Sequence, residues 1–177
     1  MFEYIKNILK NKCLKRAIIH AKRRKRVAHN FETAKTMGVI YSFNINMEAV
    51  LSILDDITKR YNIERDMIIY YPYQDNPPQV DQSSSSQIFF STDKCNWFGK
   101  PKTVDINKFI NTEFSILIDL SPESCFPLQY IAVSSHANFK IGRINDETND
   151  LYDFVLLGSK DEEQFIRDLE AYLYKIK

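Results

Sequence analysis

Glycine is scarce in this sequence, with four residues among 177. A phosphate-binding fold built on a glycine-rich loop is therefore disfavoured, and the signatures GxGxxG, GxxxxGK[ST], HExxH and GxSxG are all absent. The three cysteines share no close spacing, so neither a disulfide framework nor a zinc site is indicated. No apolar run reaches about eighteen residues, which predicts no membrane-spanning segment. We expect a cytoplasmic protein with reduced thiols and no metal or organic cofactor.

Charge is divided unevenly along the chain, although the net charge is only +1. Residues 1–30 contain ten Lys or Arg and one acid, a net charge of +9. Residues 31–177 contain fourteen basic and twenty-two acidic side chains, a net charge of −8. This asymmetry indicates a basic arm joined to an acidic globular part. We place the arm in residues 1–36 and a single α/β domain in residues 37–177.

The arm has apolar residues every three or four positions from Phe2 to Ala21, which predicts a basic amphipathic helix. Three interpretations stay open. The apolar stripe docks on the globular part, on a partner protein or on a second copy; the basic face binds the phosphates of RNA or DNA; or the helix lies on a membrane surface. We expect residues 1–21 to be docked and residues 22–30 to face solvent.

A cluster of five basic residues at positions 22–26 lies beyond most of the apolar stripe, where packing does not account for it. Its charge favours a polyanion, RNA first and ribosomal RNA in particular, bound through its phosphates rather than by base reading. Peripheral membrane contact is the less favoured alternative. The predicted polyanion-binding residues are Lys15, Arg16, Lys22, Arg23, Arg24, Lys25 and Arg26.

After the arm, short apolar runs alternate with amphipathic segments. This alternation predicts an α/β fold with three layers, a Rossmann-like and mainly parallel sheet of about six strands. Residues 72–86, with two prolines and four serines in a row, are expected to be a loop, and Ser159 and Glu162 to form a capping box for the last helix. We expect strands at residues 38–43, 67–71, 88–90, 114–120, 139–142 and 152–157, and helices at residues 47–61, 104–111 and 127–134, with a last helix that follows the capping box and runs to residue 176.

Several short segments occur together in a recognisable order. They are Asp93 to Pro101 (DKCNWFGKP), Leu117 to Ser121 (LIDLS), Tyr130 to Ala132 (YIA) and Phe139 to Arg143 (FKIGR). With the basic N-terminal helix, they resemble a family of uncharacterised proteins found mainly in Bacteroidetes and known only as a domain of unknown function. The resemblance covers nearly the whole chain and implies the fold and a bacterial cytoplasmic setting, without a reaction.

The stretch from Phe114 to Arg143 is also similar to part of one Rossmann-like lobe of the heptosyltransferase-type glycosyltransferases. Those enzymes use two such lobes, and this chain has the length for one. No donor-binding motif of that group is matched, so the likeness implies a fold and no activity.

The alternative function is an enzyme or small-molecule binder, for a nucleotide or nucleotide-sugar, because ligands of open α/β sheets bind beyond the carboxyl ends of the strands. Residues 93–102 are the most site-like, but they also suit a structured loop that fills the sheet end. Asp119 is a base, a metal ligand or the cap of a turn at Ser121, and Arg143 is an anion clamp or an ion-pair partner. The cleft candidates are Lys94, Asn96, Trp97, Lys100, Asp119, Ser121 and Arg143.

No catalytic arrangement stands out, because the three histidines are scattered along the chain. Cys125 and His136 flank one expected helix and would lie about 16 Å apart, which excludes a nucleophile–base pair. Whether the chain is an enzyme stays open at this point. We favour a non-enzymatic interaction module.

Overall fold

A computed structural model of the chain describes residues 1–42, 47–71, 87–121, 125–143, 151–157 and 161–176. The predicted loop at 72–86 and the capping residue Ser159 lie outside these ranges. The helices are α1 (Phe2–Ala21), α2 (Met47–Tyr61), α3 (Val104–Asn111), α4 (Phe126–Ser134) and α5 (Glu162–Leu173), and the strands are β1 (Thr36–Ser42), β2 (Glu64–Tyr71), β3 (Gln87–Ser91), β4 (Ile116–Asp119), β5 (Phe139–Arg143) and β6 (Phe154–Leu156).

The six strands form one sheet in the order β3-β2-β1-β4-β5-β6, and every pair is parallel. The predicted α/β fold is therefore confirmed, and its sheet is wholly parallel rather than mainly so. Val39 of β1 pairs with Met67 of β2 on one side and with Ile118 of β4 on the other. The strand order reverses between β1 and β4, which is the position where sheets of this kind bind ligands at their carboxyl ends.

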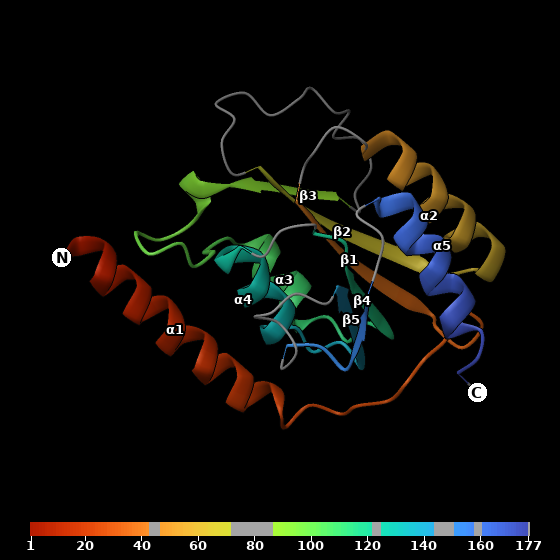
Figure 1. Ribbon diagram of the computed structural model, residues 1–177, viewed down its shortest axis with the longest axis horizontal. Coiled ribbons are helices and arrows are strands. Elements are labelled where there is room, and N and C mark those ends of the chain that lie inside the picture. Colours follow the sequence, from red (N-terminus) through yellow and green to blue (C-terminus); the bar gives the residue numbers. More distant parts are fainter. Residues whose placement is uncertain (43–46, 72–86, 122–124, 144–150, 158–160, 177) are drawn as a thin grey trace.

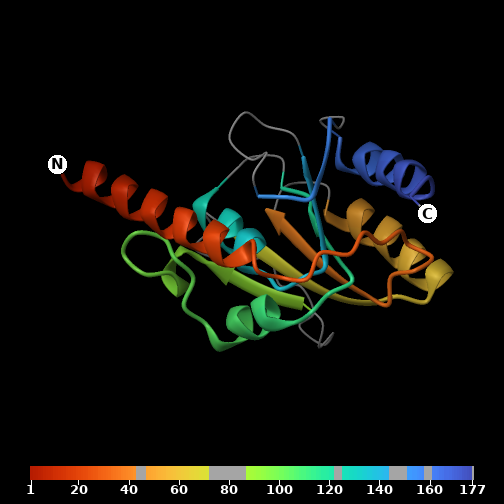
Figure 2. The ribbon, with the colours of Figure 1, turned by 90° about the horizontal axis from the view of Figure 1, so that it is seen from below.

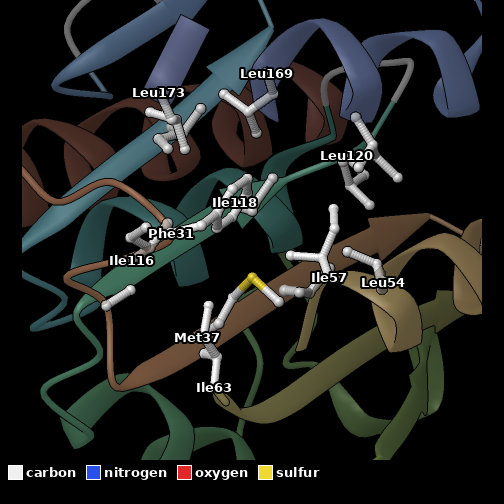
Figure 3. Packing of buried hydrophobic residues seen from close by; sticks show 14 of the residues in the cluster. Phe31, Met37, Leu54, Ile57, Ile63, Ile116, Ile118, Leu120, Leu169 and Leu173 are labelled. Carbon is white, nitrogen blue, oxygen red and sulfur yellow. The ribbon is translucent and has the colours of Figure 1, made fainter. Parts of the chain in front are cut away.

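Helices cover both faces of the sheet, which makes three layers (Figure 1). Helices α2 and α5 lie on one face, where Leu54, Ile57, Leu169 and Leu173 pack with Ile118 (Figure 3). Helices α3 and α4 lie on the other face, and their apolar side chains pack on a second cluster of buried strand residues. Because both faces are covered, β4 is buried along its whole length and begins with an apolar run of three residues.

Helix α1 adds a fourth layer outside α4 (Figures 1 and 2). Near its C-terminal end it packs on the domain through a small cluster in which Ala17 contacts Val133 and Leu151. The first turns of α1 extend past α4 at the end away from this cluster (Figure 2). The chain then runs from Lys22 to β1, and it enters the main core at Phe31 and Ala34, residues that the sequence analysis assigns to the arm.

Several predicted boundaries differ from the structure, among them the start of the last helix and the start of β2. The last helix begins at Glu162, and its N-cap is Asp161, whose side chain accepts a 3.0 Å hydrogen bond from the Glu163 backbone N–H. Asp161 therefore takes the capping position expected for Ser159, because a carboxylate there accepts an amide and also faces the positive end of the helix dipole. Strand β2 begins three residues before the expected start, at the polar residue Glu64.

Candidate functional site

Burial of α1 is greatest in its C-terminal half. Ala17 is the one buried residue of the helix, and Leu14 and Ile18 are partly buried beside it. Phe2 and Ile5, expected to dock, are 64% and 45% exposed. The prediction of a fully docked stripe is therefore wrong for the first turns, because the helix continues past the end of α4 and there contacts the Trp97 ring rather than a continuous apolar surface.

A row of aromatic rings lies beside the N-terminal half of α1. Trp97 packs on Phe2, with ring centroids 5.6 Å apart, and on Phe98, 5.5 Å away. Phe98 in turn approaches Phe126, which approaches Tyr130 on the next turn of α4. These rings connect α1 to α4 through the loop that follows β3.

That loop is a self-contained turn. The Asn96 side-chain oxygen accepts from the backbone N–H groups of Phe98 and Lys100, and Gly99 between them has φ of +95°, which a residue with a Cβ rarely adopts. Lys94 donates from its Nζ to the Phe89 carbonyl. Asn96 and Lys94 thus hold the loop together. Trp97 points toward α1, so residues 93–102 form a loop that supports this helix.

Arg24 is buried, contrary to the prediction that residues 22–30 face solvent. Its side chain is 7% exposed and forms an ion pair with Asp153. It also donates to the backbone carbonyls of Ala137 and Asn138, at 3.0 and 2.8 Å. A guanidinium with five donors can satisfy a carboxylate and two carbonyls together, which explains why an arginine of the basic cluster is used to hold the arm.

Lys140 lies beneath this anchor, fully buried in β5. Its Nζ donates a 2.7 Å hydrogen bond to the carbonyl of Val133, one of the last carbonyls of α4, which have no partner within the helix. Burial, and after it the positive charge of Arg24, lowers the pKa of Lys140 to about 7. The amine therefore spends much of its time uncharged near neutral pH.

A groove of about 800 Å³ opens between α1, the residues that follow it, and α4. Apolar and aromatic side chains, among them Leu9, Phe98 and Tyr130, form part of its lining. Glu113 is the single carboxylate among its lining residues in the described part of the chain. The cationic lining residues are Lys12, Arg16, Arg23, Arg24, Lys25 and Lys100, with His20 and His136.

The groove brings together four of the seven predicted polyanion-binding residues: Arg16, Arg23, Arg24 and Lys25. Lys15 does not line it, and neither do Lys22 and Arg26, which surround a small cavity beneath the arm. Arg26 also lies 3.6 Å from the Asp153 carboxylate.

Sequence analysis missed several residues of the groove. Lys12, Arg16 and His20 are spaced by four, which places them on one helix face, and this spacing was a usable signal. No such signal indicates that His20 and His136 line the same groove, because they are 116 positions apart in the sequence.

Lys100 belongs to the groove rather than to the sheet-end cleft. Its Nζ lies 4.8 Å from the centre of the Tyr130 ring. A hydrogen bond with the Tyr130 side chain raises the pKa of Lys100, so the amine stays charged at neutral pH. Lys100 is therefore the cation that faces the groove from the side opposite α1.

The other cleft candidates gather at the carboxyl ends of β4 and β5. Asp119 is buried, and its Oδ1 accepts a 2.9 Å hydrogen bond from the Ser121 backbone N–H, which confirms the turn-capping interpretation. Its Oδ2 accepts a 2.6 Å hydrogen bond from the Tyr152 hydroxyl. Burial raises the pKa of Asp119, and the hydrogen bonds oppose that shift. Arg143 lies over the Phe165 ring, 4.6 Å from its centre.

The structure thus divides the seven cleft candidates into two sets. Lys94, Asn96, Trp97 and Lys100 make their contacts within the loop after β3 or with α1 and α4. Asp119, Ser121 and Arg143 belong to the buried group at the sheet edge. Sequence analysis could not separate them, because both sets follow strands of the same sheet.

The cysteines of this region are poor nucleophiles. Burial raises the pKa of Cys125 to about 12 and that of Cys95 to about 11, so both thiols stay protonated at neutral pH. Among the described residues, no three His, Cys, Asp or Glu side chains are grouped so that they could hold a metal ion. Of the helices in the described ranges, none has both the length and the apolar character needed to cross a bilayer.

Comparison with known proteins assigns the family. No curated protein and no solved structure matches the chain. The Bacteroidetes origin and the likeness to a heptosyltransferase lobe therefore stay predictions. A family described as being of unknown function, DUF6913, matches residues 6–176, a range that includes every described helix and strand except the first turn of α1, and this chain belongs to that family.

Proposed function

We propose that this protein is a non-enzymatic module that binds RNA in the groove between α1 and α4. The observation that carries the proposal is the charge of the groove, which has six Lys or Arg and one carboxylate among its lining residues. Cations held on two sides of one groove suit a phosphate backbone, whose binding is driven by charge and by release of counterions.

The lining of the groove favours a single strand over a duplex. Phe98 and Tyr130 present aromatic surface beside the cations, and unpaired bases stack on such rings whatever their sequence. A stiff duplex would place only phosphates along the rim. Arg16, Arg23 and Lys25 on the α1 side and Lys100 opposite are the residues that we assign to phosphate contacts.

Two variants that lose the same number of positive charges test the proposal, because only one of them loses charges that line the groove. Arg16→Gln/Arg23→Gln removes two charges from the groove, and Lys15→Gln/Lys22→Gln removes two from the same segment outside it. Glutamine preserves helix propensity, so α1 is retained. Fluorescence anisotropy with a single-stranded RNA at a series of salt concentrations measures both affinity and its salt dependence.

We expect the groove variant to weaken RNA binding about tenfold or more and to reduce the slope of log K against log salt by about 1.4, the value for two phosphate contacts on a single strand. The control variant should bind within a factor of about two to three of the parent. Equal losses in the two variants would mean that charge alone matters, and the groove would not be the site. Heparin binding as tight as RNA binding would indicate a site for polyanions in general.

A second candidate function rests on the strand order. The reversal between β1 and β4 and the buried Asp119 at the end of β4 are the features that favour a small-molecule site for a nucleotide or nucleotide-sugar. A thermal-shift panel tests it, because a ligand at one hundred times its dissociation constant adds ~2.7 kcal/mol to the free energy of unfolding. A panel that leaves the melting temperature unchanged would count against this candidate.

A further inference from the structure

Exposed apolar side chains are concentrated at one end of the molecule. Eleven large hydrophobic residues are exposed in the described part of the chain, and six of them lie in the first turns of α1 or beside them. Phe2, Tyr4, Ile5 and Ile8 are 64%, 70%, 45% and 47% exposed, and Trp97, packed on Phe2, is 54% exposed. We call these five residues the apolar tip. Such clustering marks an interaction surface, because apolar residues scattered singly need no explanation but a group does.

The tip projects from the body of the protein. Figure 2 shows the first turns of α1 extending past α4, and Figure 1 shows the N-terminal end of α1 on the opposite side of the sheet from α2 and α5. Aromatic and aliphatic side chains that project in this way suit a partner with an extended, deformable surface better than a partner with a concave pocket.

Cations continue the same outward helix face. Lys12 and Lys15 follow Ile8 at spacings of four and seven, so they lie one and two turns further along that face, and both are exposed. Lys94 and Lys102, in the loop that carries Trp97, are exposed as well. An apolar cluster bordered by lysines is the pattern of elements that insert side chains between anionic lipid headgroups.

Charge argues against a second copy as the occupant. The tip of a second copy would carry the same bordering lysines, so its charge would not attract this tip. An anionic lipid surface instead attracts them. It also repels residues 31–177, whose net charge is −8, so the electrostatic field favours an end-on approach with the tip toward the lipid.

We propose that the apolar tip inserts into the interfacial region of membranes that contain anionic phospholipids and holds the protein there peripherally. The five tip residues do not line the groove, and Lys12 is the one bordering lysine that does, so insertion of the tip does not require RNA binding in the groove. Trp97 enters the headgroup region with Phe2, as tryptophan does at membrane interfaces.

Vesicle binding by the full chain tests the proposal. The probes are vesicles of neutral phosphatidylcholine and vesicles that also contain phosphatidylglycerol, and Trp97 reports directly because it is the single tryptophan. We expect co-sedimentation with the anionic vesicles only, weakened by salt, with a blue shift of Trp97 emission and quenching by brominated acyl chains. Equal binding to both kinds of vesicle, or emission that stays unshifted, would overturn the proposal.

Two variants separate insertion from general charge attraction. Ile5→Gln/Ile8→Gln should reduce the partition coefficient about tenfold or more, because two aliphatic side chains no longer leave water. Leu157→Gln/Tyr174→Gln changes two residues that are 80% and 72% exposed elsewhere, and should leave partitioning unchanged. Circular dichroism and melting temperature check that both variants fold.

Light scattering over a range of protein concentrations tests the competing occupant. A dimer that Ile5→Gln/Ile8→Gln abolishes would replace the membrane proposal with self-association. Loss of RNA binding in this variant, with no vesicle binding by the parent, would instead place the tip in the RNA site and would also overturn the proposal.

Discussion

The Tyr152 hydroxyl donates a 2.6 Å hydrogen bond to Oδ2 of Asp119, which joins the end of β4 to the segment before β6. The ring reaches this position because it lies flat against Gly142 of β5, where an added Cβ would be 2.5 Å from a ring carbon. Glycine at 142 is therefore required by a close approach, and the phenol fills the space that a side chain would occupy. This hydrogen bond is shorter than the 2.9 Å bond that Asp119 accepts from the Ser121 backbone N–H.

Tyr152→Phe should lower the free energy of unfolding by about 1–3 kcal/mol, because the buried Asp119 carboxylate loses a donor. Burial already raises the pKa of Asp119, and loss of the hydroxyl should raise it further. The destabilisation should therefore be largest at neutral pH and shrink as the pH falls toward about 4, where the carboxyl is protonated. Urea denaturation at both pH values measures this, with the exposed Tyr174→Phe as control.

The lowered pKa of Lys140 should make the free energy of unfolding depend on pH. Its pKa is about 7 in the folded protein against 10.5 for an ordinary lysine, so the unfolded chain binds more protons between these values. Stability should therefore rise with pH from about 7 to about 10.5, and the cost of burying the amine is fully present below pH 7.

Lys140→Met should remove the rise in the free energy of unfolding between about pH 7 and about pH 10.5. This holds whether the variant is more or less stable than the parent at any single pH. The comparison is the free energy of unfolding against pH for parent and variant, with Lys59→Met, an exposed lysine of α2, as the control. Parallel curves for the parent and Lys140→Met would contradict the assignment of a neutral buried amine.

Arg24 and Lys25 are neighbours with opposite expected roles. Arg24→Ala leaves Asp153, which is 12% exposed, without its main partner and should cost about 3–5 kcal/mol of stability. Lys25→Ala should change stability by no more than about 0.5 kcal/mol, because the side chain is exposed, and should weaken RNA binding. Chemical denaturation and RNA titration of both variants distinguish the two roles. Equal stability losses would mean that Lys25 also holds the arm.

Amide hydrogen exchange along α1 should be graded rather than uniform. Residues 2–8 should exchange fast, since their large apolar side chains are exposed, and residues 13–21 should be protected by the packing around Ala17. Mass spectrometry of overlapping peptides resolves the two halves. Protection that is equal from end to end would show that the first turns are covered in solution.

Local patterns predicted much of this fold. Helices α2 and α3 have the bounds read from apolar spacing and flanking residues, and the N-terminus of α4 was marked by Pro127. The order of strands in the sheet could not be predicted from such patterns. It depends on which of several similar apolar runs pair, and nothing in the periodicity of one strand identifies its neighbour.

The site was less predictable than the fold. The basic cluster was identified as a block, yet two of its members, Arg24 and Arg26, pair with Asp153, which is 129 positions from Arg24. Trp97 was placed at the sheet end because it follows a strand, and it packs on Phe2 instead. In both cases the deciding partner is distant in sequence, and a charge or an aromatic ring does not specify its partner by local spacing.

Because α1 is anchored at its C-terminal end, the width of the groove can change more at one end of the helix than at the other. Arg24 and the cluster around Ala17 hold this end of α1, and they would be the pivot of any tilt of the helix. A small tilt about this pivot changes the width near Ala21 little and the width near Leu9 much more. A strand bound in the groove would therefore meet a nearly constant width near Arg24 and a more adjustable width near Leu9.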